Sequence, residues 1–252
     1  MQIMKKLKDK VAVVTGGNSG IGLATAILFA ENGAKVAITG RDQETLDLAA
    51  EKIGNHAIGI ISDVSKIENI AAQYKTVSDN FGKIDVLVVN AGVYIAGALA
   101  DFTEAQFDQS SNINFKGVFF SVQKALPYLN DGASIILTSS SVSDMGVAGV
   151  SVYSATKAAV YALAKAFSSE LADRSIRVNI ISPGPVETPI MKRGGATEEQ
   201  LQGVRAMASG TTLIGRLAAP EEIAEGFLYL ASDASKYMLG GELLLDGGMR
   251  IK

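Results

Sequence analysis

The chain has 252 residues, of which 48% are hydrophobic and 19% charged, and its formal net charge is −3. This composition allows one large apolar core and offers no basic stripe, so neither nucleic acid nor a membrane surface is expected as a partner. The absence of cysteine excludes disulfides and thiolate metal sites, and no apolar run approaches the roughly 18 residues of a transmembrane helix. A cytoplasmic location is the default expectation.

Short β-branched runs alternate with longer helical patterns along the chain. The runs expected to form strands are 11–15, 35–39, 57–62, 85–89, 134–139, 176–182 and 242–246. The stretches expected to form helices are 20–32, 43–53, 66–80, 104–129, 151–173 and 220–231. This alternation predicts an α/β fold, with a parallel sheet covered by helices on both faces. No linker divides the chain, so residues 1–252 are expected to form a single domain.

Two α/β architectures are compatible with this length. A barrel of eight strands and eight helices has about 250 residues. Only seven strands are indicated here, and the turn richest in glycine follows the first of them. Both points favour an open, doubly wound (Rossmann) sheet of seven strands, with its ligand at the carboxyl ends of the strands.

The first strand runs into the sequence TGGNSGIG (15–22), which opens a helix. Glycine supplies the positive φ of a tight turn, and its missing side chain lets the backbone approach a phosphate. The start of a helix adds unpaired N–H groups and the positive end of the helix dipole. The spacing G-x-x-x-G-x-G differs from the common G-x-G-x-x-G pattern, so an ordinary strand–helix turn is the alternative interpretation.

Tyr153 and Lys157 stand four residues apart in SVYSATKAAVYALAKAF (151–167), an alanine-rich segment expected to be helical. Residues at this spacing share one helix face. A neighbouring cation favours the phenolate and lowers the pKa of the phenol, which would tune Tyr153 as a proton donor. The alternative is that Tyr153 packs in the core and that Lys157 extends to solvent.

Six motifs, in order along the chain, resemble those of the short-chain dehydrogenase/reductase family. TGGNSGIG is similar to the family's T-G-x-x-x-G-I-G, and YSATK (153–157) is similar to its Y-x-x-x-K. The other four are VNAG (89–92), INFKGVFF (113–120), ILTSSS (136–141) and ISPGPVETP (181–189). On these motifs the chain is identified as a member of the family over essentially its whole length.

The resemblance implies reversible hydride transfer between a nicotinamide cofactor and a carbonyl compound or an alcohol. Tyr153 is implied as the general acid and base, and Lys157 as the group that lowers its pKa and binds the nicotinamide ribose. The serine that hydrogen-bonds the substrate oxygen maps to Ser140, thirteen residues before the tyrosine. Asn114 maps to the asparagine that holds a water of the proton relay, and no metal is implied. The single histidine, His56, is expected in a solvated loop.

The resemblance also assigns the cofactor contacts. The glycine turn is expected to hold the pyrophosphate, residues 63–64 the adenine, residues 90–92 the adenosine ribose and residues 183–188 the nicotinamide. The expected cofactor-binding residues are Gly16, Asn18, Ser19, Gly20, Ile21, Gly22, Arg41, Asp42, Asp63, Val64, Asn90, Ala91, Gly92, Tyr153, Lys157, Pro183, Gly184, Val186 and Thr188. A helix N-cap is an alternative, and compatible, interpretation of Asp63.

The second strand ends in VAITGRDQETL (36–46), with Arg41 directly after Gly40. NAD-dependent proteins usually have an acidic residue at this strand end, whereas a guanidinium can hold a 2′-phosphate through two parallel hydrogen bonds. NADP (NADPH) is therefore the expected cofactor, and NAD is less favoured. Alternatives stay open for both residues. Arg41 is either a solvated loop charge or stacks on the adenine without a phosphate, and Asp42 either accepts from the ribose or caps the helix from 43.

The segment 190–215 shows no strand signal and is expected to form a lid over the substrate. Met191, Met207, Tyr94 and Val147 are candidates for an apolar pocket wall, which indicates a small-molecule carbonyl or alcohol as substrate. Val89 and Ser143 depart from the family pattern, where an asparagine and a glycine are common. The first departure predicts a missing hydrogen bond in the central sheet, and the second an altered pocket shape.

Two other functions stay open. A 3-oxoacyl-carrier-protein reductase would need lysine or arginine clustered near the site, but LNDGAS (129–134) has neither and Arg174 lies in another loop. A non-catalytic dinucleotide-binding regulator would be expected to lose the serine, tyrosine and lysine, all of which are present.

Self-association is also expected. The apolar strand near the C-terminus is predicted at a sheet edge, and such edges tend to find a partner. The segments 113–129 and 151–167 are apolar on more than one stripe, which indicates burial beyond the monomer core. The family resemblance implies a homotetramer, with a dimer as the next assembly.

Overall fold

The computed structural model describes residues 5–54, 56–189 and 197–252. Its centre is a seven-stranded sheet in the order β3-β2-β1-β4-β5-β6-β7, with every neighbouring pair parallel. The strands are β1 (Val11–Thr15), β2 (Lys35–Gly40), β3 (Ala57–Ile61), β4 (Ile84–Val89), β5 (Leu129–Thr138), β6 (Arg177–Pro183) and β7 (Glu242–Leu245). The predicted doubly wound sheet is confirmed, and β7 forms the edge that the sequence indicated.

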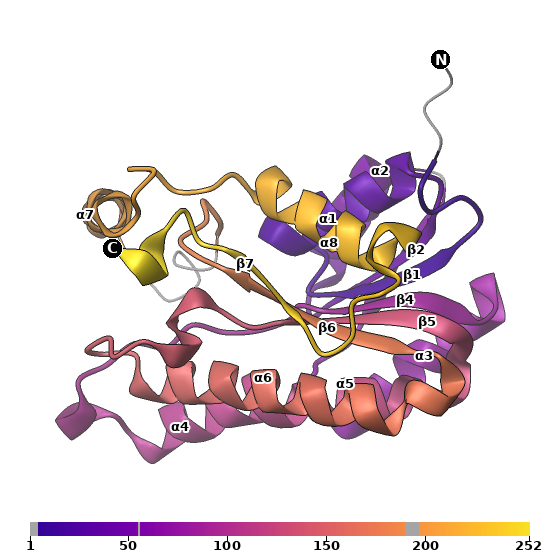
Figure 1. Ribbon diagram of the computed structural model, residues 1–252, viewed down its shortest axis with the longest axis horizontal. Coiled ribbons are helices and arrows are strands. Elements are labelled where there is room, and N and C mark those ends of the chain that lie inside the picture. The colour runs from indigo at the N-terminus through magenta and orange to yellow at the C-terminus, as the bar shows by residue number, and fades with distance from the viewer. Residues whose placement is uncertain (1–4, 55, 190–196) are drawn as a thin grey trace.

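Helices cover both faces of this sheet (Figure 1). On one face lie α1 (Gly20–Glu31), α2 (Gln43–Ile53) and α8 (Pro220–Ala231). On the other face lie α3 (Ile67–Phe81), α4 (Glu104–Ser111), α5 (Gly117–Ala125) and α6 (Ser151–Glu170). The helix α7 (Glu198–Thr211) lies apart from these layers, beside the C-terminus. Within the described residues, no helix is long and apolar enough to cross a membrane.

The alternation of side chains along each strand explains why the strands read as continuous apolar runs. In β1, Val13 packs into the core beneath α3, α5 and α6, whereas Ala12 and Val14 pack into the core beneath α1, α2 and α8. Successive residues of a strand point to opposite faces, so a strand buried on both faces must be apolar at every position. The two cores therefore both depend on the central strands.

The predicted helix 104–129 is interrupted, which corrects the sequence interpretation. A π-helical turn (Asn112–Lys116) separates α4 from α5, and a 3-10 turn (Leu126–Tyr128) follows α5. A Cβ on Gly117 would lie 2.7 Å from the carbonyl oxygen of Val64, so α5 approaches the loop after β3 too closely for a side chain. The π-helical turn determines where α5 contacts the loop after β3. It also determines the position of Asn114, which is buried within the turn.

The winding of the sheet reverses between β1 and β4, because β2 and β3 lie on one side of β1 and the later strands on the other. In doubly wound sheets, ligands bind at such a switch point, outside the carboxyl ends of the strands. The residues that follow β1 and β4 therefore mark the place to look for a site.

Candidate active site

The turn after β1 closes tightly at the switch point. Gly16 and Gly20 have φ angles of +64° and +52°, in the left-handed region that favours glycine. A Cβ on Gly22 would lie 2.3 Å from the carbonyl oxygen of Gly16, so a side chain there would open the turn. α1 begins at Gly20, within this tight turn, so the first amides of the helix lie close to the backbone of Gly16. This arrangement is the one that a phosphate cradle requires.

A pocket of about 280 Å³ lies beside this turn, between the carboxyl ends of β1, β2 and β3 and the segment after β4. It contains most of the residues that the sequence assigned to the adenosine half of a cofactor. Its lining residues are Gly16, Asn18, Thr39, Gly40, Arg41, Asp42, Thr45, Ser62, Asp63, Val64, Ala91, Gly92, Val93 and Ile113. The residues of this set that were not predicted are Thr39, Gly40, Thr45, Ser62, Val93 and Ile113. Three of them have a sequence signal: Thr39 and Gly40 end the second strand, and Thr45 stands at the third position after a capping aspartate.

Asp42 caps α2, which supports one of the two alternatives left open by the sequence. Its side chain accepts a hydrogen bond from the Thr45 amide at 2.9 Å, and this bond holds the pKa of Asp42 below its usual value. The Thr45 hydroxyl accepts a hydrogen bond from Asn18 Nδ2 at 2.8 Å. A Cβ on Gly40 would lie 3.0 Å from the Asn18 side chain, so the glycine leaves room for this polar group at the pocket wall.

Asp63 closes a short turn after β3. Its carboxylate accepts hydrogen bonds from the amide and the hydroxyl of Ser65, at 2.9 and 2.7 Å. Burial raises the pKa of Asp63, but the Ser65 hydrogen bonds and the charge of Arg41 outweigh burial and leave the pKa below its usual value. Because α3 begins at Ile67 with Lys66 as its N-cap residue, the interpretation of Asp63 as a helix cap is wrong.

Thr15 and Asn90 fasten β1 to the segment after β4. The Thr15 hydroxyl accepts hydrogen bonds from the amides of Asn90 and Ala91, at 2.9 and 3.0 Å. Asn90 Nδ2 donates to the Thr15 carbonyl at 3.1 Å. Val89 is only 3% exposed and packs in the apolar core. The junction thus has several hydrogen bonds, although the Val89 side chain itself has no polar group to contribute one.

Three polar side chains meet where β5 ends and α6 begins. Lys157 is 4% exposed, and its Nζ donates to the carbonyl of Thr138 at 2.8 Å. The same Nζ lies 5.7 Å from the ring centre of Tyr153. The side chain of Ser140, which follows the end of β5, lies near the Tyr153 phenol and acts to lower its pKa. Lys157 is therefore a buried group beside the tyrosine, and its interpretation as a solvent-exposed charge is wrong.

Burial dominates the titration of this pair. It raises the pKa of Tyr153 to about 12, whereas the nearby Ser140 side chain acts to lower this pKa. Burial also lowers the pKa of Lys157 to about 8. The expectation that the neighbouring ammonium lowers the pKa of the phenol is thus wrong in this chain, because loss of solvation disfavours the charged form of both groups.

Asn114 connects this group to the segment after β4. It is fully buried, and its amide is hydrogen-bonded to both backbone polar atoms of Val93. A Cβ on Gly92 would lie 3.2 Å from Asn114 Oδ1 and 3.6 Å from Lys157 Nζ. Asn114 and the ammonium thus flank the same glycine, which brings together the residues expected to form a proton relay.

The loop after β6 returns to the glycine turn. A Cβ on Gly20 would lie 3.2 Å from the Thr188 side chain, and Val186 forms an isolated parallel bridge with Ala218. The Gly184 amide donates to the Leu245 carbonyl at 2.9 Å. The loop expected to hold the nicotinamide therefore lies next to the turn expected to hold the pyrophosphate.

Three of the four residues expected to face the substrate lie in the described part of the chain, and their surroundings differ. The ring of Tyr94 packs edge-on against that of Tyr153, with 5.0 Å between ring centres and 72° between planes. Val147 is partly exposed and Met207 is 67% exposed, so neither is a core residue. Met191 lies outside the described residues.

His56 is an exposed loop residue, as the sequence predicted, and its carbonyl accepts a hydrogen bond from the Val36 amide.

The chain's own geometry fits a dinucleotide. The glycine turn forms a cradle that a Cβ on Gly22 would fill, and the pocket of about 280 Å³ continues from it toward Arg41. Lys157, Asn114 and the loop 183–188 lie at the other end of the same edge of the sheet. A doubly wound fold with these side chains at its switch point defines the class of oxidoreductases that use a nicotinamide dinucleotide.

Comparisons with known proteins identify the family. A family model described as enoyl-(acyl carrier protein) reductase matches residues 16–250. The chain is 38% identical to the 3-oxoacyl-[acyl-carrier-protein] reductase FabG of Thermotoga maritima, over 98% of this chain and 100% of that protein. It is 36% identical to the NADP-dependent (R)-specific alcohol dehydrogenase of Lentilactobacillus kefiri, over 96% of this chain and 97% of that one.

A solved structure agrees with these sequence relatives. A short-chain type dehydrogenase/reductase from Mycobacterium marinum superposes with a TM-score of 0.91 at 33% identity, covering 99% of this chain and 98% of that chain. The chain belongs to the short-chain dehydrogenase/reductase family.

Proposed function

We propose that this protein transfers a hydride between NADP(H) and a small carbonyl compound or secondary alcohol. The observation that carries the proposal is the arrangement at the end of β5, where Tyr153 lies beside the buried Lys157 and near the buried Ser140. A phenol, a hydroxyl and an amine held together in this way supply a proton donor, a hydrogen-bond donor for the substrate oxygen and a cation.

The residues then have separate roles in the reduction direction. The bound dinucleotide supplies the hydride. Tyr153 gives its proton to the developing alkoxide, and the raised pKa keeps its phenol protonated before the reaction. Ser140 donates a hydrogen bond to the same oxygen. Lys157 holds the nicotinamide ribose and passes protons to Tyr153, and Asn114 fixes the backbone beside the ammonium through Val93.

The preference for NADP(H) is proposed from the end of β2. Arg41 is exposed and lines the pocket of about 280 Å³, directly after the strand ends at Gly40. Asp42 next to it uses its carboxylate to cap α2, so it is engaged by the protein itself. An exposed guanidinium and an engaged carboxylate favour a 2′-phosphate over a bare 2′-hydroxyl.

Reduction of a 3-oxoacyl carrier protein is the second candidate, favoured by the names of the matching family model and of the Thermotoga relative. The structure offers one observation against it. All three guanidinium nitrogens of Arg174 donate within the protein, to Asp131 and to the carbonyls of Leu126 and Leu129. This arginine is therefore poorly placed to grip an acidic carrier. A non-catalytic regulator is the third candidate, and the assembled serine, tyrosine and lysine disfavour it.

We also propose that residues 1–252 form a single domain, that 190–215 includes a substrate lid, and that the protein is a cytoplasmic homotetramer. Self-association is supported by apolar side chains near the exposed edge strand β7, where Tyr237 is fully exposed and Leu239 is 51% exposed. Light scattering at micromolar concentration tests the assembly, and a single monomer peak would contradict it.

The activity is tested by following NADPH absorbance with four probes: acetophenone, ethyl acetoacetate, hexanal and acetoacetyl-coenzyme A. Turnover of the ketone, ketoester or aldehyde above the thioester supports the first candidate. A strong preference for the thioester supports the second. Binding of NADPH without turnover of any probe would contradict both and favour the regulator.

A further inference from the structure

The C-terminal 3-10 turn (Met249–Ile251) folds back against the loop that carries Ser140. Figure 1 shows this turn in yellow, beside α7 at the edge of the sheet where the strands end. It contacts the 3-10 turn Ser141–Asp144, which directly follows Ser140. The catalytic loop thus has a neighbour that the six sequence motifs do not include.

Arg250 makes most of this contact. Its side chain is 14% exposed. Nε donates to the Ser141 carbonyl and pairs with Asp144 Oδ1, both at 2.9 Å. Nη2 donates to the carbonyl of Ser140 at 3.3 Å and to the hydroxyl of Ser143 at 3.1 Å. One guanidinium therefore holds four residues of a single loop.

The same guanidinium is anchored to the edge of the sheet. Nη1 and Nη2 donate to the two carboxylate oxygens of Glu242, at 3.1 and 3.0 Å, and the Glu242 side chain is 16% exposed. Glu242 begins β7, which is separated from β5 by β6. Paired bonds to a partly buried carboxylate fix the plane of the guanidinium. Arg250 consequently ties the loop after β5 to a strand that is not its neighbour.

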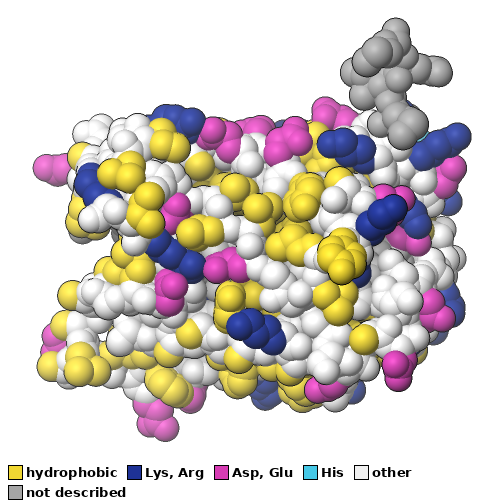
Figure 2. All heavy atoms as spheres, viewed as in Figure 1, with side chains coloured by type: hydrophobic (Ala, Val, Ile, Leu, Met, Phe, Trp, Pro, Cys, Tyr) yellow, Lys and Arg dark blue, Asp and Glu magenta, His cyan; other side chains and the backbone are white. Residues whose placement is uncertain are grey.

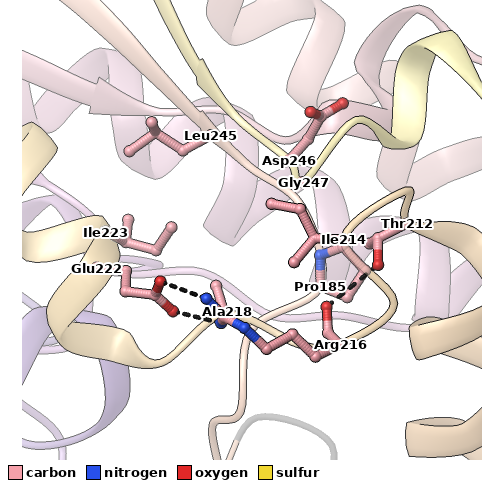
Figure 3. Close-up of a pocket in the computed structure, with 10 residues that line it drawn as sticks. All are labelled: Pro185, Thr212, Ile214, Arg216, Ala218, Glu222, Ile223, Leu245, Asp246 and Gly247. Carbon is pink, nitrogen blue, oxygen red and sulfur yellow. Dashed lines mark hydrogen bonds and ion pairs between the residues drawn. The ribbon is translucent and has the colours of Figure 1, made fainter.

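Asp246 holds the backbone of this C-terminal segment in place. Its carboxylate accepts hydrogen bonds from the amides of Gly248 and Arg250, at 2.9 and 2.8 Å. Figure 3 shows the carboxylate pointing away from Arg216 and Glu222, which pair with each other across a smaller pocket of about 160 Å³. Asp246 thus takes no part in that ion pair, and its carboxylate instead stabilises the turn that carries Arg250.

The loop's internal hydrogen bonds are few. The Ser140 hydroxyl accepts from the Val142 amide at 3.4 Å, and the Ser140 carbonyl accepts from the Ser143 amide at 3.1 Å. Charge-assisted bonds from a guanidinium are stronger than such neutral ones. The Ser140 side chain also lies near the Tyr153 phenol and acts to lower its pKa, so a shift of the loop would part the two groups.

We propose that Arg250 is a positioning residue, which fixes residues 140–144 so that the Ser140 hydroxyl stays beside the Tyr153 phenol. It acts through Ser140 and has no contact with the phenol in this proposal. The serine at position 143, which departs from the family pattern, takes part as an acceptor for Arg250. The kinetic consequence rests on the proposed carbonyl reduction, whereas the structural consequence does not.

The structural arm of the test is hydrogen–deuterium exchange of the full chain. Arg250→Met should speed exchange at the amides of Ser143 and Met145, which close the turn. Arg174→Met is the matched control, because Arg174 also binds two carbonyls and a carboxylate but at the far end of β5. Unchanged exchange over residues 139–146 in Arg250→Met, or the same change in the control, would overturn the proposal.

The kinetic arm is a double-mutant cycle with Ser140→Ala, using the probe among the four with the highest rate. Arg250→Met should lower kcat about 10–100-fold, as expected for a misplaced catalytic group, with NADPH affinity changed less than about twofold. In the Ser140→Ala background the same substitution should change kcat by less than about threefold, because coupled residues are not additive. Equal losses in both backgrounds would overturn the proposal.

The two arms separate two kinds of failure. If wild type turns over none of the four probes, the proposed carbonyl reduction fails, and the exchange measurement still decides whether Arg250 fixes the loop. If wild type is active and the exchange is unchanged, the positioning role fails and the proposed function stands. Arg250→Lys should restore only part of kcat, because an ammonium cannot reach both Glu242 and the loop carbonyls with the same fork geometry.

Discussion

Asn114 pairs with the backbone of Val93 through both polar atoms of its side chain: Nδ2 donates to the Val93 carbonyl at 2.8 Å, and Oδ1 accepts from the Val93 amide at 2.9 Å. The amide that the family resemblance assigns to a relay water thus also clamps the segment after β4 onto the π-helical turn. Its loss should therefore be felt in stability as well as in turnover.

We expect Asn114→Ala to lower the free energy of unfolding by about 1–3 kcal/mol, because it leaves the two Val93 groups without their partners. Urea unfolding measures this change. Ser110→Ala is the matched control, since the buried Ser110 hydroxyl lies on the preceding helix and has no hydrogen-bond partner among the described residues. Equal losses in the two variants would show that the clamp contributes nothing.

Removal of the phenol should separate chemistry from binding. Tyr153→Phe is expected to lower kcat by about 10²–10⁴-fold, the usual contribution of a general acid, with little change in NADPH affinity. Tyr161→Phe, two turns further along α6, is the control and should keep wild-type turnover. Retention of more than about a tenth of the wild-type rate in Tyr153→Phe would remove the tyrosine from the mechanism.

The cofactor preference depends on Arg41. Arg41→Ala should weaken NADPH by about 1.5–3 kcal/mol, the usual strength of a hydrogen bond to a charged group, and should leave NADH nearly unaffected. Fluorescence titration of both cofactors measures the difference. Lys66→Ala is the control for long-range charge, because Lys66 also acts on the nearby Asp63 but does not line the pocket. Equal losses for the two cofactors would contradict a 2′-phosphate contact.

The buried ammonium should make stability depend on pH in a known direction. Burial lowers the pKa of Lys157 to about 8 in the folded chain, from 10.5 as the ordinary value. Between these pH values the unfolded chain binds one more proton than the folded chain, so the contribution of Lys157 to stability rises with pH by up to about 1.4 kcal/mol per pH unit. Below pH 8 both states are protonated, and the dependence vanishes.

The measurement is the difference in unfolding free energy between wild type and Lys157→Met from pH 7 to 10. We stop at pH 10 because the raised pKa of Tyr153 acts with the opposite sign above that pH, where the unfolded phenol ionises first. Lys165→Met, an exposed position on the same helix, should show no such trend. A flat difference curve for Lys157→Met would mean that the ammonium is solvated.

The sequence predicted the strands well because each is apolar on both faces and therefore visible without any knowledge of its neighbours. The tyrosine, lysine and asparagine were placed by the motifs. The direction of the Tyr153 pKa shift was wrong, because burial depends on which layers cover α6 and the sequence shows only the neighbour four residues away. The fork between Arg250 and the loop after β5 joins residues about 110 apart in sequence, so no local pattern reveals it.

The region 104–129 shows why helix interruptions are hard to predict from sequence. Its apolar spacing is compatible with one continuous helix, because a π-helical turn keeps the helical direction and changes only the rotation of the next helical segment. The sequence also predicted no helix within 190–215, where the structure shows α7 from Glu198 to Thr211. The molecule is hollowed at its left edge in Figure 2, next to the place of α7 in Figure 1.

The π-helical turn Asn112–Lys116 makes the fold sensitive to the number of residues between α4 and α5. Each residue of a helix rotates the next by about 100°, so removal of one residue from the turn would leave a continuous helix and rotate α5 relative to α4 by that angle. The face of α5 that packs on α3, with Val118 and Val122, would then point elsewhere, although every remaining side chain would be unchanged. A single deletion here should therefore be more damaging than most substitutions at the same positions, and an added residue on the α5 side should partly restore the fold.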